Sequence, residues 1–224
     1  MSVILLRLEG PMQSWGIDSR FSDRYTEAEP SKSGVIGLIS SALGHSREKE
    51  LEELVKMKMA IRVDREGKIV HDFHTVLNVV RADAKGEITP SKIGTVVSRR
   101  FYIEDACFTV GLESKDETLL ININKALRQP KWPLFLGRKS YPPISPISLS
   151  DQVFKGPLEE VIKKLPWQGR EHENQPDRLR FITECGLNDG EPRFDVPISF
   201  SPRKFRSRNV RTEFISIETQ KQEV

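Results

Sequence analysis

Two amphipathic segments set between short apolar runs constrain the fold of this chain more than any other feature. Residues 35–43 place apolar side chains at the i, i+3, i+4 spacing of a helix, and residues 117–127 do the same. Apolar runs with strand character flank both segments, beginning with residues 3–8. The order strand, helices, strand, strand, long insertion, strand, helix predicts a ferredoxin-like α+β domain.

The ends of the first helix are marked by residues with known capping preferences. Ser31 or Ser33 is placed to accept hydrogen bonds from the unpaired amides of the first turn, and Gly44 follows the last periodic residue as a stop. A second helix is expected at 46–56 and a short proline-opened helix at 157–165. We expect strands at residues 3–8, 59–63, 68–77, 106–112, 179–183, 194–198 and 210–217.

The long insertion covers about residues 78–100, which are polar and show no sustained period of either kind. A segment of this length inside a compact domain is usually functional or disordered. We therefore predict an RRM-like domain over residues 1–146, with an arm inserted at about 78–100, followed by a smaller β-rich region over 147–224. A chain of 224 residues buries enough surface to fold without a metal or disulfide, and we expect no cofactor.

Positive charge is gathered in a few stretches, although the net charge of the chain is only +3. Residues 76–102 carry five Lys/Arg against two acids, residues 128–141 carry four against none, and residues 203–211 carry five against none. Patched positive charge is typical of nucleic-acid binders, but solvated basic loops also produce it. The last stretch is either an RNA-facing strip or an edge strand protected by charge, and we favour the second.

Signatures of catalysis are absent from the sequence: there is no Gly-rich nucleotide loop, GxSxG elbow, HExxH pair or paired-carboxylate motif. His71 and His74 share a predicted strand, and their spacing of three puts them on opposite faces, which disfavours a metal pair. His74 is still a candidate general base for RNA cleavage, beside the interpretations that it is hydrogen-bonded at a sheet edge or contacts RNA. Cys107 and Cys185 lie too far apart in sequence to predict a zinc site, and Cys107 is expected to be buried.

Several short segments suit a single strand of RNA, which needs flat rings for its bases and small polar donors for their edges. Trp15, in the turn after the first strand, is either a stacking platform or a core residue, and the sequence leaves both open. Residues 30–34, at the expected helix start, either bind a phosphate or only cap the helix. Gly137 to Ser140 combines a glycine with two cations, a pattern that favours phosphate binding.

No stretch approaches the length and apolarity of a membrane span, and the N-terminus becomes acidic after a short apolar run. We therefore expect a cytoplasmic protein without membrane contacts.

Ordered motifs resemble a known family over residues 3 to about 146. Residues 6–16 (LRLEGPMQSWG) and 30–38 (PSKSGVIGL) are similar to the opening of the Cas-five family of CRISPR-associated proteins, type I-E subtype. Residues 73–76 (FHTV), 100–108 (RFYIEDACF) and 135–140 (FLGRKS) resemble the later signatures in the expected order. Beyond residue 146 the likeness is only one of size and basic strands.

The resemblance implies an RRM-like domain of the RAMP superfamily with a β-hairpin thumb at about 78–100. It implies a non-catalytic subunit that grips the 5′ handle of the CRISPR guide RNA (crRNA) and caps the backbone filament of the Cascade complex. Its neighbours would be the backbone subunit and the large PAM-reading subunit, with target DNA met only indirectly. Including residues chosen from charge and aromaticity, the expected RNA-binding set is Gln13, Trp15, Ser31, Lys32, Ser33, His74, Arg81, Lys85, Lys92, Arg99, Arg100, Tyr102, Gly137, Arg138 and Lys139.

The related I-C subtype cleaves repeat RNA with a tyrosine and a lysine–histidine pair. This sequence contains no adjacent Lys-His dipeptide. The resemblance therefore implies that the chain is not an enzyme, and a metal-independent ribonuclease using His74, with Tyr102 or Lys139 nearby, is the alternative.

Overall fold

The computed structural model describes residues 1–17, 22–82, 88–170 and 172–217, and for residues 81, 82 and 88–92 only the backbone. The helices are α1 (Lys32–Leu43), α2 (Glu52–Lys56), α3 (Glu117–Arg128) and α4 (Leu158–Lys164). The strands are β1 (Ser2–Glu9), β2 (Met12–Gln13), β3 (Asp23–Arg24), β4 (Lys58–Arg65), β5 (Lys68–Ala82), β6 (Ile88–Glu104), β7 (Cys107–Ser114), β8 (Phe154–Lys155), β9 (Leu179–Cys185), β10 (Glu191–Phe200) and β11 (Arg203–Ile215).

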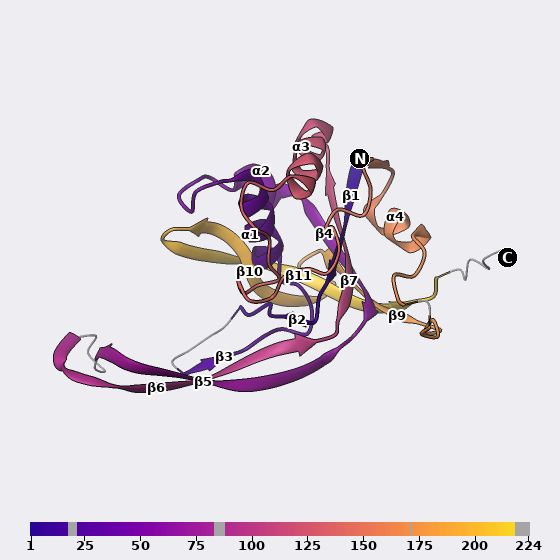
Figure 1. The fold of residues 1–224 in the computed structure, drawn as a ribbon. Helices are drawn as coiled ribbons and strands as arrows, with labels where there is room; N and C mark the ends of the chain where they lie inside the picture. The colour runs from indigo at the N-terminus through magenta and orange to yellow at the C-terminus, as the bar shows by residue number, and fades with distance from the viewer. Residues whose placement is uncertain (18–21, 83–87, 171, 218–224) are drawn as a thin grey trace.

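The body of the molecule is an antiparallel sheet with strand order β10-β11-β9-β4-β7-β1-β8 (Figure 1). β1 pairs with β7 along its whole length, from Ser2 opposite Ser114 to Glu9 opposite Cys107. β4 lies on the other side of β7, and β8 on the other side of β1. The prediction of a mixed α+β fold is therefore confirmed.

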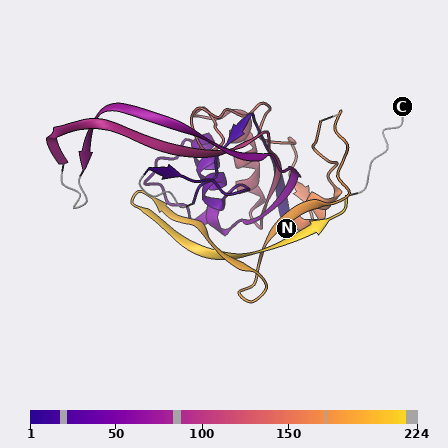
Figure 2. The ribbon, with the colours of Figure 1, turned by 90° about the horizontal axis from the view of Figure 1, so that it is seen from below.

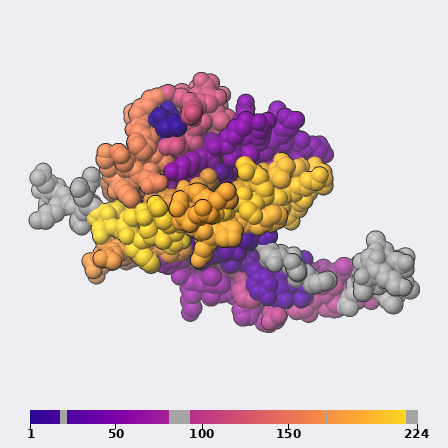
Figure 3. Space-filling model, turned by 180° about the vertical axis from the view of Figure 1, so that it is seen from behind, coloured from indigo at the N-terminus to yellow at the C-terminus, as the bar shows by residue number. Residues whose placement is uncertain are grey.

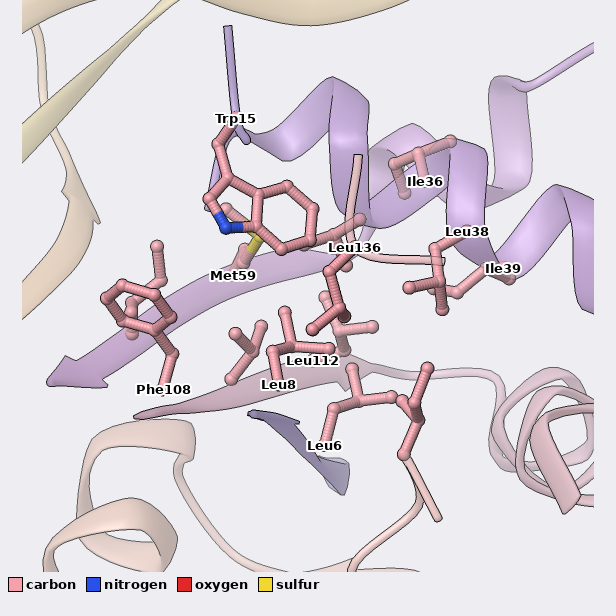
Figure 4. Packing of buried hydrophobic residues seen from close by; sticks show 14 of the residues in the cluster. Leu6, Leu8, Trp15, Ile36, Leu38, Ile39, Met59, Phe108, Leu112 and Leu136 are labelled. Atoms are coloured by element: carbon pink, nitrogen blue, oxygen red, sulfur yellow. The ribbon is translucent and has the colours of Figure 1, made fainter. Parts of the chain in front are cut away.

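Both faces of the sheet are covered, which explains why β1 is apolar on both of its faces. Leu6 and Leu8 belong to the larger core, beneath α1 and α3, where Figure 4 shows them with Ile36 and Phe108. The alternate side chains of β1 join α4 in a second core on the opposite face. Cys107 is fully buried, as expected, and this burial raises the pKa of its thiol to about 12.

The C-terminal strands continue the same sheet. β9 pairs with β4, with Ala60 opposite Thr183, and β11 and β10 follow outward. Figure 3 shows them as a yellow and orange band between the arm and the purple segment near residue 50. Hydrogen bonds join strands of residues 1–146 and of residues 147–224 into one sheet. The division into these two regions stays a prediction.

β5 and β6 form a long antiparallel hairpin that extends away from the body (Figures 1 and 2). Its register runs from Lys68 opposite Glu104 to Ala82 opposite Ile88, so the arm is longer than the predicted insertion at about 78–100. The expectation that residues 88–100 lack regular structure is wrong. Among the described side chains of this part of the hairpin, residues 93–100, none belongs to either core, so apolar and polar residues need not alternate here.

The second expected helix is shorter than predicted: residues 46–56 contain only the five-residue α2. Residues 46–50 are polar or charged, and Leu51 is the first buried apolar side chain after α1. A helix without an apolar face to bury is marginal in water, which accounts for the late start. Among the described residues no helix has the length and apolarity to cross a membrane.

A buried ionic network joins the start of α1 to the C-terminal strands. The Lys32 ammonium donates to Glu184 and to the Met57 carbonyl oxygen, at 2.8 Å each. Asp195 accepts the Lys32 backbone N–H at 2.7 Å, and Arg208 donates to Asp195 through two nitrogens at 2.7 and 2.9 Å and to Glu184 at 3.1 Å. Burial lowers the pKa of Lys32, and the Glu184 carboxylate opposes that shift.

Lys32→Ala should destabilise the fold by about 3 kcal/mol, because it leaves buried carboxylate charge without one of its partners. The check is chemical denaturation of both proteins. The matched control is Lys58→Ala, whose ion pair with Glu159 is 39% and 34% exposed and should contribute less than about 1 kcal/mol. Equal stability losses in the two variants would contradict a structural role for Lys32.

Candidate nucleic-acid interface

Two adjoining hollows lie between α1, the loop of residues 132–142 and the turn between β10 and β11. The smaller is a cavity of about 170 Å³ and the larger a groove of about 870 Å³. They share the lining residues Ser33, Gly34, Gly137, Phe200 and Arg203, so they form one continuous surface. We call this surface the α1 groove.

Two glycines allow the walls of the α1 groove to approach one another. A β-carbon on Gly34 would lie 2.7 Å from Cε3 of Trp15, so only glycine lets the indole pack on the start of α1. Gly137 has φ +91°, and a β-carbon there would lie 1.7 Å from the Ser14 carbonyl oxygen. The Ser14 N–H donates to the Leu136 carbonyl oxygen at 3.0 Å, fixing the loop in this position.

The start of α1 contributes hydroxyls to the α1 groove. Ser31 is the N-cap, as one of the two sequence interpretations held, and its Oγ accepts from the Gly34 N–H at 3.3 Å. The Oγ of Ser33 lies 3.3 Å from that of Ser31. The Lys32 N–H donates to Asp195, that of Gly34 to the Ser31 Oγ, and that of Val35 to the Ser31 carbonyl oxygen. Three amides of this turn are therefore already bound within the protein, and phosphate binding here stays a prediction.

The charged side chains of the α1 groove are all basic. Arg47, Lys139 and Arg203 are exposed, and no acidic residue is among its described lining residues. His45 also lines the groove, and burial together with the nearby Lys49 lowers its pKa. A neutral imidazole has one donor and one acceptor nitrogen. The hollow can therefore attract a polyanion and also offer hydrogen bonds.

Aromatic rings complete the lining of the α1 groove. Trp132, Phe135 and Phe200 line the larger hollow, and the Trp132 side chain is 45% exposed. Phe205 lines the smaller cavity, with the Arg203 guanidinium 5.4 Å from the centre of its ring. Exposed rings beside cations are what a single nucleic-acid strand requires for stacking and phosphate neutralisation.

Four of the expected RNA-binding side chains are buried and bound to partners inside the protein: Ser31, whose Oγ caps α1, and Gln13, Trp15 and Lys32. The Gln13 amide donates to the carbonyl oxygens of Leu8 at 3.1 Å and Ala106 at 2.9 Å, and accepts from the Trp15 indole at 3.1 Å. Trp15 is 2% exposed and sits in the core, as Figure 4 shows. Lys32 lies in the ionic network. RNA contact by Gln13, Trp15 or Lys32 is not supported by this placement.

Arg138 is half-buried and binds the loop of residues 132–142 to the base of the arm. Its guanidinium donates to the Tyr141 hydroxyl at 3.0 Å, to the Phe101 carbonyl oxygen at 2.9 Å and to the Arg24 carbonyl oxygen at 3.3 Å. These bonds use three of its five N–H donors within the protein, so in the structure it positions the loop.

The arm residues of the expected set lie on two faces of the hairpin. On one face, the Arg99 Nε forms an ion pair with the Asp23 carboxylate at 2.7 Å. The centre of the His71 ring lies 5.1 Å from that of Phe101, and the Phe101 ring also stacks on Tyr25. His71 and His74 contact different residues on opposite faces, as the sequence predicts.

On the other face of the arm, the His74 imidazole lies 2.9 Å from Asp72, and Arg100 donates to the Ser98 hydroxyl at 3.3 Å. The centre of the Tyr102 ring lies 5.9 Å from that of Tyr141, which belongs to the loop of residues 132–142. Lys85 lies outside the described residues, as do the side chains of Arg81 and Lys92. Within the described part of the chain, no group of three His, Cys, Asp or Glu residues could hold a metal ion.

Comparison with known proteins decides the family. The model of the family described as CRISPR-associated protein (Cas_Cas5) matches residues 3–211. The chain belongs to this Cas5 family.

Relatives of this Cas5 chain cover nearly its whole length. It is 29% identical to "CRISPR system Cascade subunit CasD" of Escherichia coli (strain K12), over 92% of this chain and 93% of the relative. A solved structure titled "Crystal structure of Cas protein" is 36% identical, with a TM-score of 0.76, over 96% of this chain and 95% of that one. A chain of a "CRISPR RNA-guided surveillance complex" is 33% identical, with a TM-score of 0.79, over 96% and 91% of the two chains.

In this Cas5 chain, five residues of the expected set line one hollow: Trp15, Ser31, Ser33, Gly137 and Lys139, of which Trp15 and Ser31 are buried. The structure adds residues that sequence reasoning missed: Arg47, Trp132, Phe135, Phe200 and Phe205. The turn between β10 and β11 forms one wall of the α1 groove. Its sequence signal was the basic stretch 203–211, from which the structure brings Arg203 to the groove.

Gly137→Ala should destabilise this Cas5 protein by about 2 kcal/mol or more, because the new methyl group meets the Ser14 backbone at a left-handed φ. Gly37→Ala is the matched control. It lies within α1, and its β-carbon would be 3.6 Å from the Phe200 ring, so it should be neutral or stabilising by up to about 1 kcal/mol. Thermal unfolding of both variants checks this, and a Gly137→Ala protein as stable as wild type would contradict the packing.

Proposed function

We propose that this protein is a non-catalytic RNA-binding subunit of a type I-E CRISPR Cascade complex and binds the 5′ handle of the crRNA in the α1 groove. The observation that carries the proposal is a hollow lined by three exposed cations and several aromatic rings, with no acid among its described lining residues. The relative named as a Cascade subunit and the chain from an RNA-guided surveillance complex support the biological setting.

Each group in the α1 groove has a defined task in this proposal. Lys139, Arg203 and Arg47 neutralise phosphates, which provides most of the affinity and makes it dependent on salt. Trp132 and Phe200 stack with bases, at about 1–3 kcal/mol per base. The hydroxyl of Ser33 contacts a sugar or phosphate oxygen, while Ser31 caps the helix beneath it. Gly137 leaves room for the strand to approach the backbone.

We further propose that the core is an RRM-like domain of the RAMP type. The strand order β4-β7-β1-β8, with α1 between β1 and β4 and α3 between β7 and β8, supports a ferredoxin-like arrangement. The β5–β6 hairpin is then the thumb, inserted between the second and third core strands. Residues 147–224 supply the last core strand and the smaller β-rich region.

The arm is the surface we propose for the neighbouring backbone subunit. Its exposed apolar side chains include Phe73 at 65%, Leu77 at 66% and Ile93 at 61%, more than a solvated hairpin requires. The large PAM-reading subunit would contact the body, and target DNA would be met only through the assembled complex. We place the assembly in the cytoplasm.

The double variant Lys139→Ala/Arg203→Ala should bind handle-containing RNA at least about tenfold more weakly at moderate salt. The slope of log affinity against log salt should become shallower by about 0.7 for each phosphate that the variant no longer neutralises. Fluorescence anisotropy over a salt series measures both quantities.

The matched control for this experiment is Lys164→Ala, an exposed lysine on α4, which covers the opposite face of the sheet. Its affinity and salt slope should equal those of the wild type. An unchanged slope in the double variant would exclude the α1 groove as the phosphate-binding surface.

The proposal of binding without cleavage has its own test. Purified protein incubated with repeat RNA in EDTA should leave the RNA intact, and His74→Ala should behave like wild type. The described partner of the His74 imidazole is Asp72, on the exposed surface of the arm. A specific cut that His74→Ala abolishes would establish the ribonuclease alternative instead.

A further inference from the structure

One edge of β5 makes no strand pairing in the described part of the chain. On its other side β5 pairs with β6, and β6 in turn pairs with β2 and β3 (Figure 1). We call the unpaired side the outer edge of β5. The register with β6 is regular from Lys68 to Val76, and a bulge follows, in which Asn78 has φ +57°. Along this regular stretch, main-chain N–H and C=O groups of the outer edge are open to another strand.

The usual protections of a free strand edge are missing from β5. Natural proteins place proline and charged residues, especially lysine, on such edges to prevent pairing with another chain. Residues 69–80 contain no proline, lysine or arginine. The sequence of β6 has both Pro90 and Lys92 in its own outer half. An edge as long and as unprotected as that of β5 is expected to be paired in solution.

The side chains along the outer edge suit a polypeptide better than a nucleic acid. Phe73 is 65% exposed and Val76 is 44% exposed, although both are apolar. Residues 69–80 offer no Lys or Arg to neutralise a phosphate. A second strand would satisfy the main-chain groups and cover these side chains together.

The sequence of the regular stretch is complementary to itself. When two copies of β5 pair antiparallel with Phe73 on the two-fold axis, Phe73 lies opposite Phe73 and Val70 lies opposite Val76. Asp72 of each copy then lies opposite His74 of the other. These two side chains are 41% and 44% exposed, and within one chain they already lie 2.9 Å apart. The pairing therefore joins apolar with apolar residues and sets no like charges opposite each other.

We propose that the outer edge of β5 is a dimer interface, where a second copy of this chain adds its own β5 as an antiparallel strand. The same edge serves on both copies, as a closed two-fold interface requires. The inference goes beyond the proposed function, because the pairing needs neither RNA nor another subunit. In the free chain, the dimer covers the Phe73 side chain that the proposed function gives to the backbone subunit.

Cysteine crosslinking of the full-length protein tests the pairing. Phe73→Cys should form a disulfide-linked dimer on mild oxidation, because opposite β-carbons of an antiparallel pair lie about 5 Å apart, close to the spacing of a disulfide. Ile93→Cys is the matched control. It lies on β6, where Ile93 is 61% exposed, and it should stay monomeric. Wild type reports any background from its two native cysteines.

A mixture of two variants tests the register. His71 and Thr75 lie opposite one another only across the proposed interface. His71→Cys and Thr75→Cys should therefore crosslink when they are mixed, and neither should crosslink alone. A mixture that gives no crosslinked dimer would overturn the proposed pairing.

Sedimentation of the free chain over a concentration series measures the strength of the dimer. Phe73→Asp should weaken dimerisation at least about tenfold, because it removes the apolar contact and sets two carboxylates opposite each other. Ile93→Asp should stay within about twofold of wild type. Thermal melts verify that both variants fold. A wild type that is monomeric at every concentration, or a dimer that Phe73→Asp leaves intact, would reject the interface.

This inference and the proposed function fail separately. Lys139→Ala/Arg203→Ala should dimerise like wild type whether or not it binds RNA, so RNA binding that this variant retains counts only against the proposed function. If wild type is monomeric and Phe73→Asp abolishes copurification with the backbone subunit, the outer edge receives that subunit instead of a second copy. The dimer interface is then rejected, and the proposed function stands.

Discussion

The buried ionic network around Lys32 is the constraint on which the candidate site depends. It joins the first residue of α1 to Glu184 on β9, Asp195 on β10 and Arg208 on β11. Four charges with little access to water are compensated only if all of them stay together. The network therefore holds the C-terminal strands against the helix and keeps their turn, with Phe200 and Arg203, at the edge of the groove.

The other wall of the groove depends on close backbone contact rather than on charge. Gly34 and Gly137 let the Trp15 indole, α1 and the 132–142 loop pack together, and Arg138 links that loop to the arm. A change in any of these contacts would move Lys139 relative to Arg203. The body therefore presents its cations on a rigid frame, while the arm projects from that frame with little core of its own (Figure 2).

The order of strands and helices could be predicted from the sequence because burial imposes a period on each element. Residues 35–43 and 117–127 carry a helical period and form α1 and α3. Where no face packs on a core, as over residues 93–100, the period disappears, so periodicity did not predict β6 there and only the resemblance implied a hairpin. The late start of α2 has a related cause. Residues 46–50 are polar or charged and have no apolar side chain to bury, so the helix begins only at Glu52.

The candidate site was harder to predict, because residue type does not reveal what a side chain faces. Lys32 and Trp15 belong to residue types that bind RNA, yet both are buried, and Lys32 neutralises Glu184 instead. Ser33 and Lys139 were expected because they accompany glycines near helix or loop ends. Phe200 and Trp132 come from distant segments, and only the tertiary fold places them on one hollow.

Crosslinking tests the central claim most directly. RNA bound to the wild-type protein is irradiated with ultraviolet light, and the attached peptides are identified by mass spectrometry. The account predicts crosslinks at the rings that line the α1 groove, Trp132, Phe135 and Phe200. Crosslinks confined to α4 and the opposite face of the sheet, with these three rings unmodified, would contradict it.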